Sequence, residues 1–238
     1  MHKQNNVEIS KNLEGYAARP KGEGAHPGVV VIMEIYGITG HIQGVCKRLA
    51  DAGFTALAPD IFHGQLIPYS DPQAATAKVP TLQDEKMLSE VAASLDWLDA
   101  HGTQGKNGII GLCMGGRLAF LANCRLPERL KATVAFYGGS IAPGVEGKDK
   151  FGRTPPISEA AKMQNPIFLG YGADDQGITP DEHARIASAL SAAKKRYTLA
   201  VYPAAAHAFL CEERANYVPA AAALAWPEAI AFLKNNLS

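Results

Sequence analysis

Three residues that could act together in nucleophilic catalysis occur far apart in the sequence, in the order Cys113, Asp175, His207. A free thiol has an ordinary pKa of about 8.5, so a neighbouring imidazole that accepts its proton would make it a better nucleophile at neutral pH. An aspartate beside that imidazole would fix its tautomer and stabilise its protonated form. Together these residue types predict the attack of a sulfur atom on a carbonyl carbon.

The sequence around the cysteine predicts a strand, a sharp turn and a helix. Gly111-Leu112-Cys113-Met114-Gly115 fits the motif G-x-S-x-G with cysteine in place of serine. This motif holds a nucleophile on a strained turn above the end of a sheet. Its glycines leave room where strand and helix pass closely. The N–H group of Met114, at the start of the helix, would point toward an oxyanion.

A less specific interpretation exists for each residue. Cys113 could be a small buried residue of a turn, because free cysteine is among the most buried residue types. Asp175 could cap the helix that begins at Pro180, and His207, in an alanine-rich loop, could simply be exposed. The adjacent Asp174 is a second candidate for the acid. Three coincidences in the required order are harder to explain than one, so the sequence favours a triad.

The elements that must position these residues alternate along the chain. Apolar runs predict strands, and apolar residues at helical spacing predict helices between them. This alternation is typical of an α/β fold, with a mainly parallel sheet covered by helices on both faces. The three reactive residues then follow different strands, at the edge where such sheets bind ligands. We expect strands at 28–33, 54–58, 107–112, 130–137, 166–172 and 197–202, and helices at 41–52, 83–101, 114–123, 180–193 and 217–235.

The two ends of the chain add further expectations. Residues 7–10 and 13–18 should form a hairpin at the edge of the sheet. Pro219 fits the first turn of the last helix, whereas Pro227 should kink or divide it. No internal repeat, linker or change in composition divides the chain, so we expect one domain over residues 1–238.

Two longer segments lack a clear period. Residues 60–80 contain one glycine and three prolines, and we expect a long surface segment that borders a pocket. Phe62 and Tyr69 could line that pocket or anchor the segment on the core. Residues 140–165 are rich in glycine, proline and charge, and we expect an excursion over the surface with its charges in solvent.

The composition is that of an ordinary globular chain. Hydrophobic residues make up 47% and charged residues 19%, and 23 basic side chains balance 23 acidic ones. A net charge of zero gives no overall field that would attract nucleic acid or an anionic membrane. The N-terminus predicts no signal peptide, and no run is long enough to span a membrane. We therefore expect neither nucleic acid nor a membrane as a partner.

The cysteines also limit the class of protein. Cys46, Cys113, Cys124 and Cys211 form no C-x-x-C pair, which is typical of a reducing cytoplasm rather than a disulfide framework. No cluster of ligands indicates a zinc site. We expect a cytoplasmic protein without a metal or other cofactor, a monomer or small homo-oligomer, whose partner is a small-molecule substrate.

Five segments resemble the dienelactone hydrolase family, or carboxymethylenebutenolidases, of the α/β-hydrolase superfamily. They are residues 33–37, 58–62, 111–117, 175–178 and 202–209, and the resemblance spans most of the chain. It implies an α/β-hydrolase fold and a triad of Cys113, Asp175 and His207. It also implies an oxyanion hole formed by the backbone N–H groups of Ile35 and Met114.

Glu34 ends the apolar run of residues 28–33. On position alone it could be a surface carboxylate or a helix-capping partner. The resemblance implies that Glu34 contacts the resting thiol and helps to deprotonate it when substrate arrives.

The chain departs from the family in the arginines that hold the carboxylate of dienelactone. The resemblance places one in the segment after the third strand and one shortly after the histidine. Here no arginine lies between Arg48 and Arg117, and the position four after His207 is Cys211. Arg214 follows and matches an arginine common in the wider family, although it could form a structural ion pair.

The resemblance therefore implies a hydrolase that cleaves a lactone or activated ester through a thioester acyl-enzyme, with Tyr36, Phe209 and Arg214 as candidate substrate contacts. One alternative is a general carboxylesterase, and another is a non-catalytic α/β-hydrolase-like binding protein. A phosphate or dinucleotide site fits less well, because no Lys-Ser/Thr follows Gly116 and the spacing is not G-x-G-x-x-G.

Overall fold

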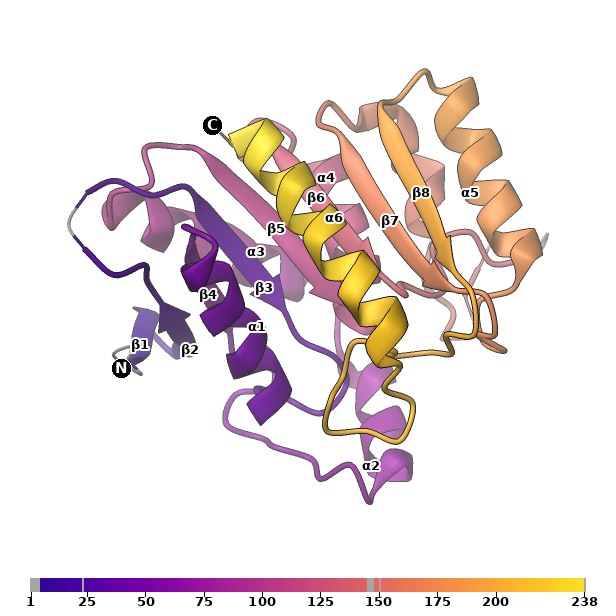
Figure 1. Cartoon of the computed structure of the whole chain (residues 1–238), viewed down its shortest axis with the longest axis horizontal. Helices are drawn as coiled ribbons and strands as arrows, with labels where there is room; N and C mark the ends of the chain where they lie inside the picture. Colours follow the sequence, from indigo (N-terminus) through magenta and orange to yellow (C-terminus); the bar gives the residue numbers. More distant parts are fainter. Residues whose placement is uncertain (1–4, 23, 145–147, 150, 238) are drawn as a thin grey trace.

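The computed structural model describes residues 5–22, 24–144, 148–149 and 151–237, and within them eight strands form one central sheet (Figure 1). The order across the sheet is β1-β2-β4-β3-β5-β6-β7-β8. The pairs β1–β2 and β2–β4 are antiparallel and all other neighbours are parallel, which confirms the hairpin and the mainly parallel sheet. The strands are β1 (Asn5–Ser10), β2 (Leu13–Ala18), β3 (Gly28–Ile32), β4 (Thr55–Pro59), β5 (Asn107–Leu112), β6 (Ala132–Phe136), β7 (Ile167–Gly172) and β8 (Tyr197–Tyr202).

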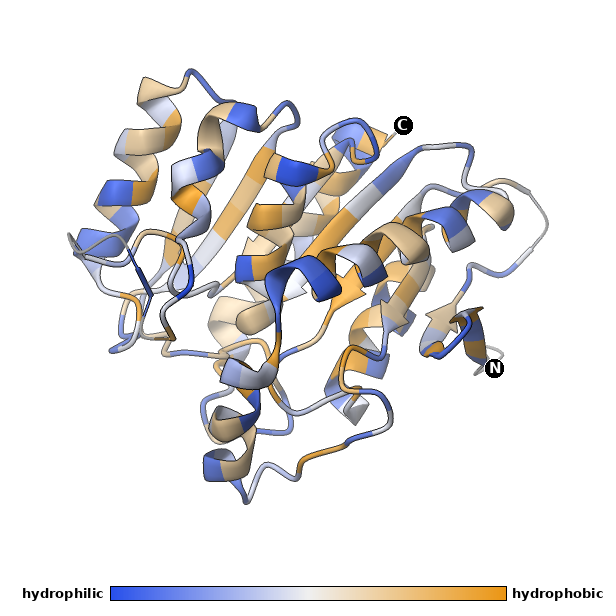
Figure 2. Ribbon diagram, turned by 180° about the vertical axis from the view of Figure 1, so that it is seen from behind, coloured by the Kyte–Doolittle hydropathy of each residue, from blue (hydrophilic) through white to orange (hydrophobic). Residues whose placement is uncertain are grey.

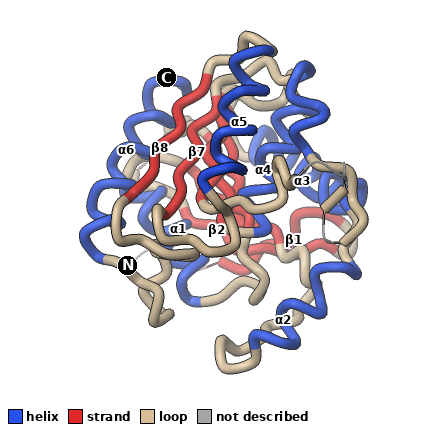
Figure 3. The backbone as a smooth tube through the Cα atoms, turned by 90° about the vertical axis from the view of Figure 1, so that its right-hand side faces the viewer, coloured by secondary structure: helices blue, strands red, loops and turns tan. Residues whose placement is uncertain are grey.

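Helices cover the sheet on both sides, as expected for this fold class. α1 and α6 lie on one face and α3 and α4 on the other, as the front, rear and side views in Figures 1, 2 and 3 show. The α-helices are α1 (Gly40–Asp51), α2 (Pro72–Lys78), α3 (Asp84–Ala100), α4 (Met114–Arg125), α5 (Pro180–Ala192) and α6 (Pro219–Leu237), with short 3-10 helices η1 (Val79–Thr81) and η2 (Pro156–Lys162). The expected strands and helices agree with these bounds to within two residues.

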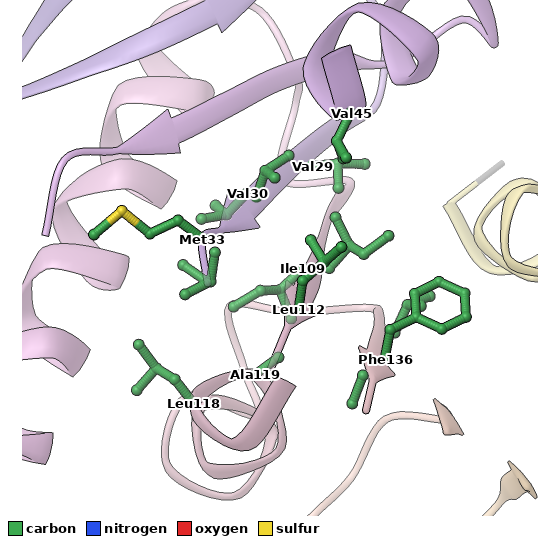
Figure 4. Close-up of a cluster of buried hydrophobic side chains, with 14 of the residues drawn as sticks. Val29, Val30, Met33, Val45, Ile109, Leu112, Leu118, Ala119 and Phe136 are labelled. Atoms are coloured by element: carbon green, nitrogen blue, oxygen red, sulfur yellow. The ribbon is translucent and has the colours of Figure 1, made fainter. Parts of the chain in front are cut away.

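The core lies between the sheet and the two helical layers. Every residue of β3, β5, β6 and β7 is buried, as is usual for parallel strands covered on both faces. Figure 2 shows the apolar strands behind helices that carry both polar and apolar residues. Figure 4 shows Val30, Met33 and Leu112 in one cluster with Leu118 of α4. The strand and the helix on either side of the turn between β5 and α4 are therefore held together by packed apolar side chains.

The segment 60–80 differs from its expectation because it contains α2 and η1. The Asp71 carboxylate caps α2 by accepting a hydrogen bond from the N–H of Ala74 at 3.0 Å, and Pro72 occupies the first turn. Phe62 is buried, and the ring of Tyr69 packs edge-on against that of Tyr36 with 4.7 Å between ring centroids. Both aromatic residues therefore anchor segment 60–80 on the core.

The segment 140–165 is also less exposed than expected. Ile141 and Met163 are buried, and the carboxylate of Asp149 is buried against Arg153. The charges of Asp149 and Arg153 are therefore largely withdrawn from solvent, whereas Lys148 and Lys162 are exposed as expected. The expectations for Gly147 and Lys150 lie outside the described residues, as does the stretch 1–4 at the N-terminus.

The C-terminal helix tests part of a further expectation. Pro219 lies in the first turn of α6 as predicted, and α6 continues through Pro227 as one helix, so Pro227 does not divide it. Across the part of the chain that the structure describes, no helix is long and apolar enough to cross a membrane. All four cysteines are free thiols.

Candidate active site

Cys113 occupies a strained turn between β5 and α4. Its φ of 57° and ψ of −117° lie outside the regions that residues other than glycine prefer. A β-carbon on Gly111 would overlap the carbonyl group of Gly115, and one on Gly115 would overlap the carbonyl group of Ile32. The backbone N–H of Cys113 donates to the carbonyl oxygen of Phe136 at 3.0 Å. Glycines are therefore required on both sides for the turn to present the thiol.

The structure brings Cys113, His207 and Asp175 together from the ends of three strands. His207 Nε2 lies 3.1 Å from Cys113 Sγ, and His207 Nδ1 lies 2.7 Å from Asp175 Oδ2. Asp175 Oδ1 accepts hydrogen bonds from the N–H groups of Gly177 at 2.8 Å and Ile178 at 3.2 Å. These bonds hold the carboxylate in place. Asp175 does not cap α5, whose N-cap residue is Thr179. The other candidate for the acid, Asp174, is exposed.

The loop that carries His207 is fixed from two sides. Asn216 Nδ2 donates a hydrogen bond to the carbonyl oxygen of His207 at 3.0 Å. The ring of Tyr137, which directly follows β6, packs edge-on against the imidazole with 5.3 Å between ring centroids. The first contact fixes the backbone of the loop, and the second limits rotation of the imidazole away from the thiol. Neither residue carried a signal in the sequence, because the contacts depend on how two loops meet.

The electrostatics of the three groups favour a charged imidazole. Burial disfavours the protonated form of His207, but the negative charge of Cys113 and the hydrogen bond to Asp175 raise the pKa of the imidazole to about 10. Burial would raise the pKa of Asp175, yet the hydrogen bond from His207 and two backbone N–H groups hold it below its ordinary value. The arrangement therefore supports an imidazolium between a carboxylate and a sulfur atom.

A cavity of about 490 Å³ opens beside Cys113, Asp175 and His207. Ile35 and Met114, whose N–H groups the resemblance assigns to an oxyanion hole, line it next to Cys113 and His207. Its wall also includes residues of α2, η1, α4 and the segments that follow β6, β7 and β8. They are Thr76, Val79, Arg117, Gly139, Ser140, Phe151, Arg153, Asp174, Asp175, Gln176, Gly177, Ile178, Ala206 and Asn216. The segments 60–80 and 140–165 thus both contribute to its shape.

Glu34 lies at the end of β3 but does not make the contact expected of it. Its side chain is buried, and neither carboxylate oxygen has a hydrogen-bond partner among the described residues. The thiol of Cys113 is directed to His207 instead. The structure thus holds the thiol in the orientation that proton transfer to histidine requires.

The three candidate substrate contacts lie outside the residues that line the cavity. Tyr36 and Phe209 are buried in the core, where the ring of Phe209 packs against that of Tyr137 with 5.5 Å between ring centroids. The guanidinium of Arg214 lies over the ring of Tyr36 at 5.2 Å and over that of Tyr69 at 5.9 Å. Tyr36 and Phe209 therefore contribute to packing, and Arg214 makes cation–π contacts with the rings of Tyr36 and Tyr69.

The cavity includes residues to which the sequence analysis assigned no role. Arg117 stands four residues after Cys113, one helical turn away, and this spacing could have indicated it. Phe151 and Arg153 come from a segment without periodicity, so nothing in the sequence pointed to them.

Among the residues described, no group of three or more histidine, cysteine or acidic side chains is arranged to hold a metal ion.

Comparison with known proteins gives consistent matches over nearly the whole chain. The sequence model of the "Dienelactone hydrolase family" matches residues 13–237. A "Putative carboxymethylenebutenolidase" of Synechocystis sp. is 33% identical over 91% of this chain and 90% of its own. A "Probable 2-oxo-3-(5-oxofuran-2-ylidene)propanoate lactonase" of Bradyrhizobium sp. is 34% identical over 97% of this chain and 94% of its own. The crystal structure of a "Putative Dienelactone Hydrolase" of Klebsiella pneumoniae superposes with a TM-score of 0.88, at 32% identity and 98% coverage of both chains.

Proposed function

Because this chain belongs to the dienelactone hydrolase family and is a carboxylic ester hydrolase, we propose that it cleaves a lactone or activated ester through Cys113. In this proposal His207 and Asp175 complete a catalytic triad, and the acyl group passes through a thioester on the cysteine. The observation that carries the proposal is the continuous contact from Asp175 through His207 to the thiol, at 2.7 and 3.1 Å, on the wall of the cavity.

Acylation begins with attack of the Cys113 sulfur on the ester carbonyl carbon. The carbonyl electrons move to oxygen, and the N–H groups of Ile35 and Met114 are proposed to bind the resulting oxyanion. Loss of one such donor typically costs about 2.7–4 kcal/mol in the activation barrier. When the tetrahedral intermediate collapses, the C–O bond breaks and the leaving oxygen takes the proton from His207. The products of this half-reaction are a thioester and an alcohol or enol, which an ester releases and an opened lactone keeps on its acyl chain.

Deacylation uses the same imidazole as a base. Once the sulfur is acylated it no longer carries negative charge, so the main influence that raises the pKa of His207 is removed. The neutral imidazole can then accept a proton from water, whose oxygen attacks the thioester carbon. Collapse breaks the C–S bond, releases the acid and regenerates the ion pair of sulfur and imidazolium.

Glu34 is proposed to act in a second resting state, in which the Cys113 sulfur is protonated and turned away from His207. Glu34 would take that proton, the thiolate would then turn to the protonated His207, and Glu34 would return the proton when the thiol re-forms. Its buried carboxylate has no hydrogen-bond partner within the described part of the chain, which leaves both oxygens free to accept one. A thiolate expels good leaving groups more readily than poor ones. Enol lactones and aryl esters are therefore the proposed substrate class.

The nucleophile can be tested by labelling with iodoacetamide and peptide mass spectrometry. Cys113 is partly exposed at the cavity, whereas Cys46, Cys124 and Cys211 are buried. Burial raises the pKa of Cys124 to about 12 and that of Cys211 to about 11, and holds the pKa of Cys46 far above its ordinary value. We expect iodoacetamide to label Cys113 before the other cysteines, and the activity to fall in proportion to the fraction of Cys113 that is labelled.

Turnover of dienelactone and of aryl esters should then be compared in Cys113→Ala and in Cys211→Ala as the matched control. We expect the first variant to lose activity on both substrates and to form no acyl-enzyme by intact mass. Wild-type turnover in Cys113→Ala would rule out the cysteine mechanism. The ratio of the two rates in the wild-type protein would distinguish a lactonase from a general carboxylesterase.

A further inference from the structure

One residue of the cavity wall shares an unusual backbone conformation with the proposed nucleophile. Of the residues described along that wall, Cys113 and Ser140 are the two non-glycine residues with a positive φ, at 57° and 59°. A positive φ is unfavourable for a residue with a β-carbon, whereas glycine adopts it readily. Strain of this kind is concentrated at functional sites. Ser140 thus keeps a hydroxyl group at a position where the backbone favours glycine.

The fold places Ser140 beside the reacting groups. Strand β6 lies between β5 and β7 in the sheet, and the turns after β5 and β7 carry Cys113 and Asp175. The segment that follows β6 therefore runs between these two residues. Tyr137, three residues before Ser140, packs edge-on against the imidazole of His207 with 5.3 Å between ring centroids. A substrate bound in the cavity at Cys113 is therefore enclosed by the wall to which Ser140 belongs.

Two side chains of α5 fix the backbone that follows Ser140. Glu182 Oε1 accepts a hydrogen bond from the N–H of Ala142 at 3.0 Å, and Arg185 Nε donates to the carbonyl oxygen of Ala142 at 2.8 Å. Glu182 is only 5% exposed, so water competes little for its bond. Both polar groups of one peptide segment are thus held by a single helix.

The backbone that precedes Ser140 is fixed as well. The hydroxyl of Tyr171 donates to the carbonyl oxygen of Gly138 at 3.5 Å. A β-carbon on Gly138 would lie 2.7 Å from the carbonyl carbon of Gly116, so the segment touches the first turn of α4. Because it is fixed on both sides, the segment presents the Ser140 side chain at one place in the cavity wall.

The hydroxyl of Ser140 is available to a ligand. Ser140 is half-buried and lines the cavity, and its side chain makes no hydrogen bond with another residue that the structure describes. Two amide groups of the same wall are already engaged. Gln176 Nε2 donates to the carbonyl oxygen of Asp174 at 3.3 Å, and Asn216 Nδ2 donates to that of His207 at 3.0 Å. A polar group of a substrate therefore finds an unused donor and acceptor at Ser140.

We propose that Ser140 is a specificity-determining residue whose hydroxyl binds a hydroxyl group of the substrate, outside the ester that is cleaved. This inference rests on the proposed function, because the ligand is the substrate of that site. Each hydroxyl can donate or accept, so the two groups can pair in either direction. Neither group is charged, so their burial in the wall needs no counter-ion. The protein then prefers hydroxyl-bearing esters or lactones over esters in which an alkyl group takes that place.

Matched pairs of esters test the proposal. One pair is 3-(hydroxymethyl)phenyl acetate and 3-ethylphenyl acetate, which differ by a hydroxyl in the leaving group. The other pair, the 4-nitrophenyl esters of 3-hydroxybutanoic acid and of 3-methylbutanoic acid, differs by a hydroxyl in the acyl group. The KM and kcat of all four are measured for the wild-type protein, Ser140→Ala and Ser140→Gly. Asn12→Gly is the control, because it also places glycine at a positive φ, of 69°, in the turn between β1 and β2.

The two variants at position 140 separate the hydroxyl from the backbone. Both remove the hydroxyl, but Ser140→Ala keeps the strained β-carbon and Ser140→Gly relieves it. Thermal unfolding should therefore show Ser140→Gly to be at least as stable as Ser140→Ala. A loss of binding that the two variants share is then a loss of the hydroxyl and not of folding.

We expect both variants to raise KM for the hydroxyl-bearing ester of at least one pair by about 3- to 10-fold, the range for one hydrogen bond between uncharged groups. The alkyl esters should stay within about twofold, and Asn12→Gly should change no KM. An equal effect on both members of each pair, or no effect on either pair, would overturn the proposal. An effect in Ser140→Ala that is absent in Ser140→Gly would also overturn it, because the backbone would then be responsible.

Binding measured without turnover separates this proposal from the proposed function. The dissociation constants of the same esters are determined by calorimetry in Cys113→Ala and in Cys113→Ala combined with Ser140→Gly. If the wild-type protein hydrolysed no ester, the proposed function would fail, and these constants would still decide whether Ser140 selects hydroxyl groups. If the wild-type protein hydrolysed all four esters and Ser140 changed none of the constants, the proposal for Ser140 alone would fail.

Discussion

Cys113 Sγ and Asp175 Oδ2 contact opposite nitrogens of one imidazole, with His207 Nε2 at 3.1 Å from the sulfur and Nδ1 at 2.7 Å from the carboxylate. Two groups that can be negative therefore flank a group that can be positive. Their attraction exceeds the cost of burying the imidazolium, and the pKa of His207 rises to about 10.

Replacement of Cys113 by alanine should lower the pKa of His207 toward its ordinary value of about 6.5. The substitution removes the negative charge and the hydrogen bond of the sulfur, while burial, which disfavours the charged imidazole, remains. Titration of the imidazole by ¹⁵N NMR between pH 5 and about 11 would measure the change. Cys211→Ala is the control, because the thiol of Cys211 contacts the hydroxyl of Tyr69 at 3.5 Å and not the imidazole of His207. Identical titrations in the two variants would show that the sulfur at position 113 does not stabilise the imidazolium.

Replacement of Asp175 by asparagine should lower kcat by roughly 10⁴-fold, the size of effect that loss of the correct imidazole tautomer has in a serine triad. Asparagine is nearly the same size, but its amide cannot stabilise the imidazolium as a carboxylate does. Asp174→Asn is the matched control, because Asp174 is adjacent and exposed. Because Asp174 also lines the cavity, we expect a change in KM at most, and a kcat close to that of the wild-type protein. A comparable loss in both variants would point to disruption of the loop rather than to a role for Asp175.

Much of this fold could be predicted because its strands and helices carry strong local patterns. Continuous apolar runs such as residues 28–32 have few alternatives to a buried strand. The contact between Cys113, Asp175 and His207 was also predictable, because each residue follows a strand at the same edge of the sheet. Parallel topology brings such positions together even when they are nearly a hundred residues apart.

The shape of the cavity was harder to predict because it depends on segments without periodicity. The charges of Asp149 and Arg153 suggested a solvated surface, yet they are buried because each satisfies the other and Asp149 also binds two backbone N–H groups. The opposite error was made for Tyr36 and Phe209, which were expected to contact the substrate. Their aromatic rings stand close in sequence to the site, but they fill the core behind it.

The strained turn at Cys113 should make Gly111→Ala strongly destabilising. A β-carbon there would overlap the backbone of Gly115, which cannot move without displacing α4. Gly108→Ala, on the same strand, is the matched control, because its β-carbon would meet Leu237 at 3.1 Å and Ala132 O at 3.2 Å. We expect a loss of about 3 kcal/mol or more in the free energy of unfolding for Gly111→Ala and a clearly smaller loss for Gly108→Ala. Urea unfolding measures both, and equal losses would contradict the role assigned to the turn.

Glu212 links the segment after His207 to α1, and this link should make stability depend on pH in acid. Glu212 Oε2 lies 2.6 Å from His41 Nδ1, and Oε1 pairs with Arg48. Burial would raise the pKa of Glu212, but His41 and Arg48 lower it to about 2. A carboxylate whose pKa falls on folding stabilises the protein fully above its ordinary value of about 4.5, and this contribution disappears as the pH falls through about 2.

Glu212→Gln should therefore lower the free energy of unfolding at pH 7 by about 1 kcal/mol, a small effect because the side chain is 41% exposed and solvent screens its charge. The difference between wild type and variant should shrink steadily as the pH falls from about 4.5 toward 2. Urea unfolding at several pH values measures this difference, with Glu8→Gln as a control in the exposed strand β1. A difference that stays constant over the acid range would mean that the carboxylate at position 212 contributes through packing and not through its charge.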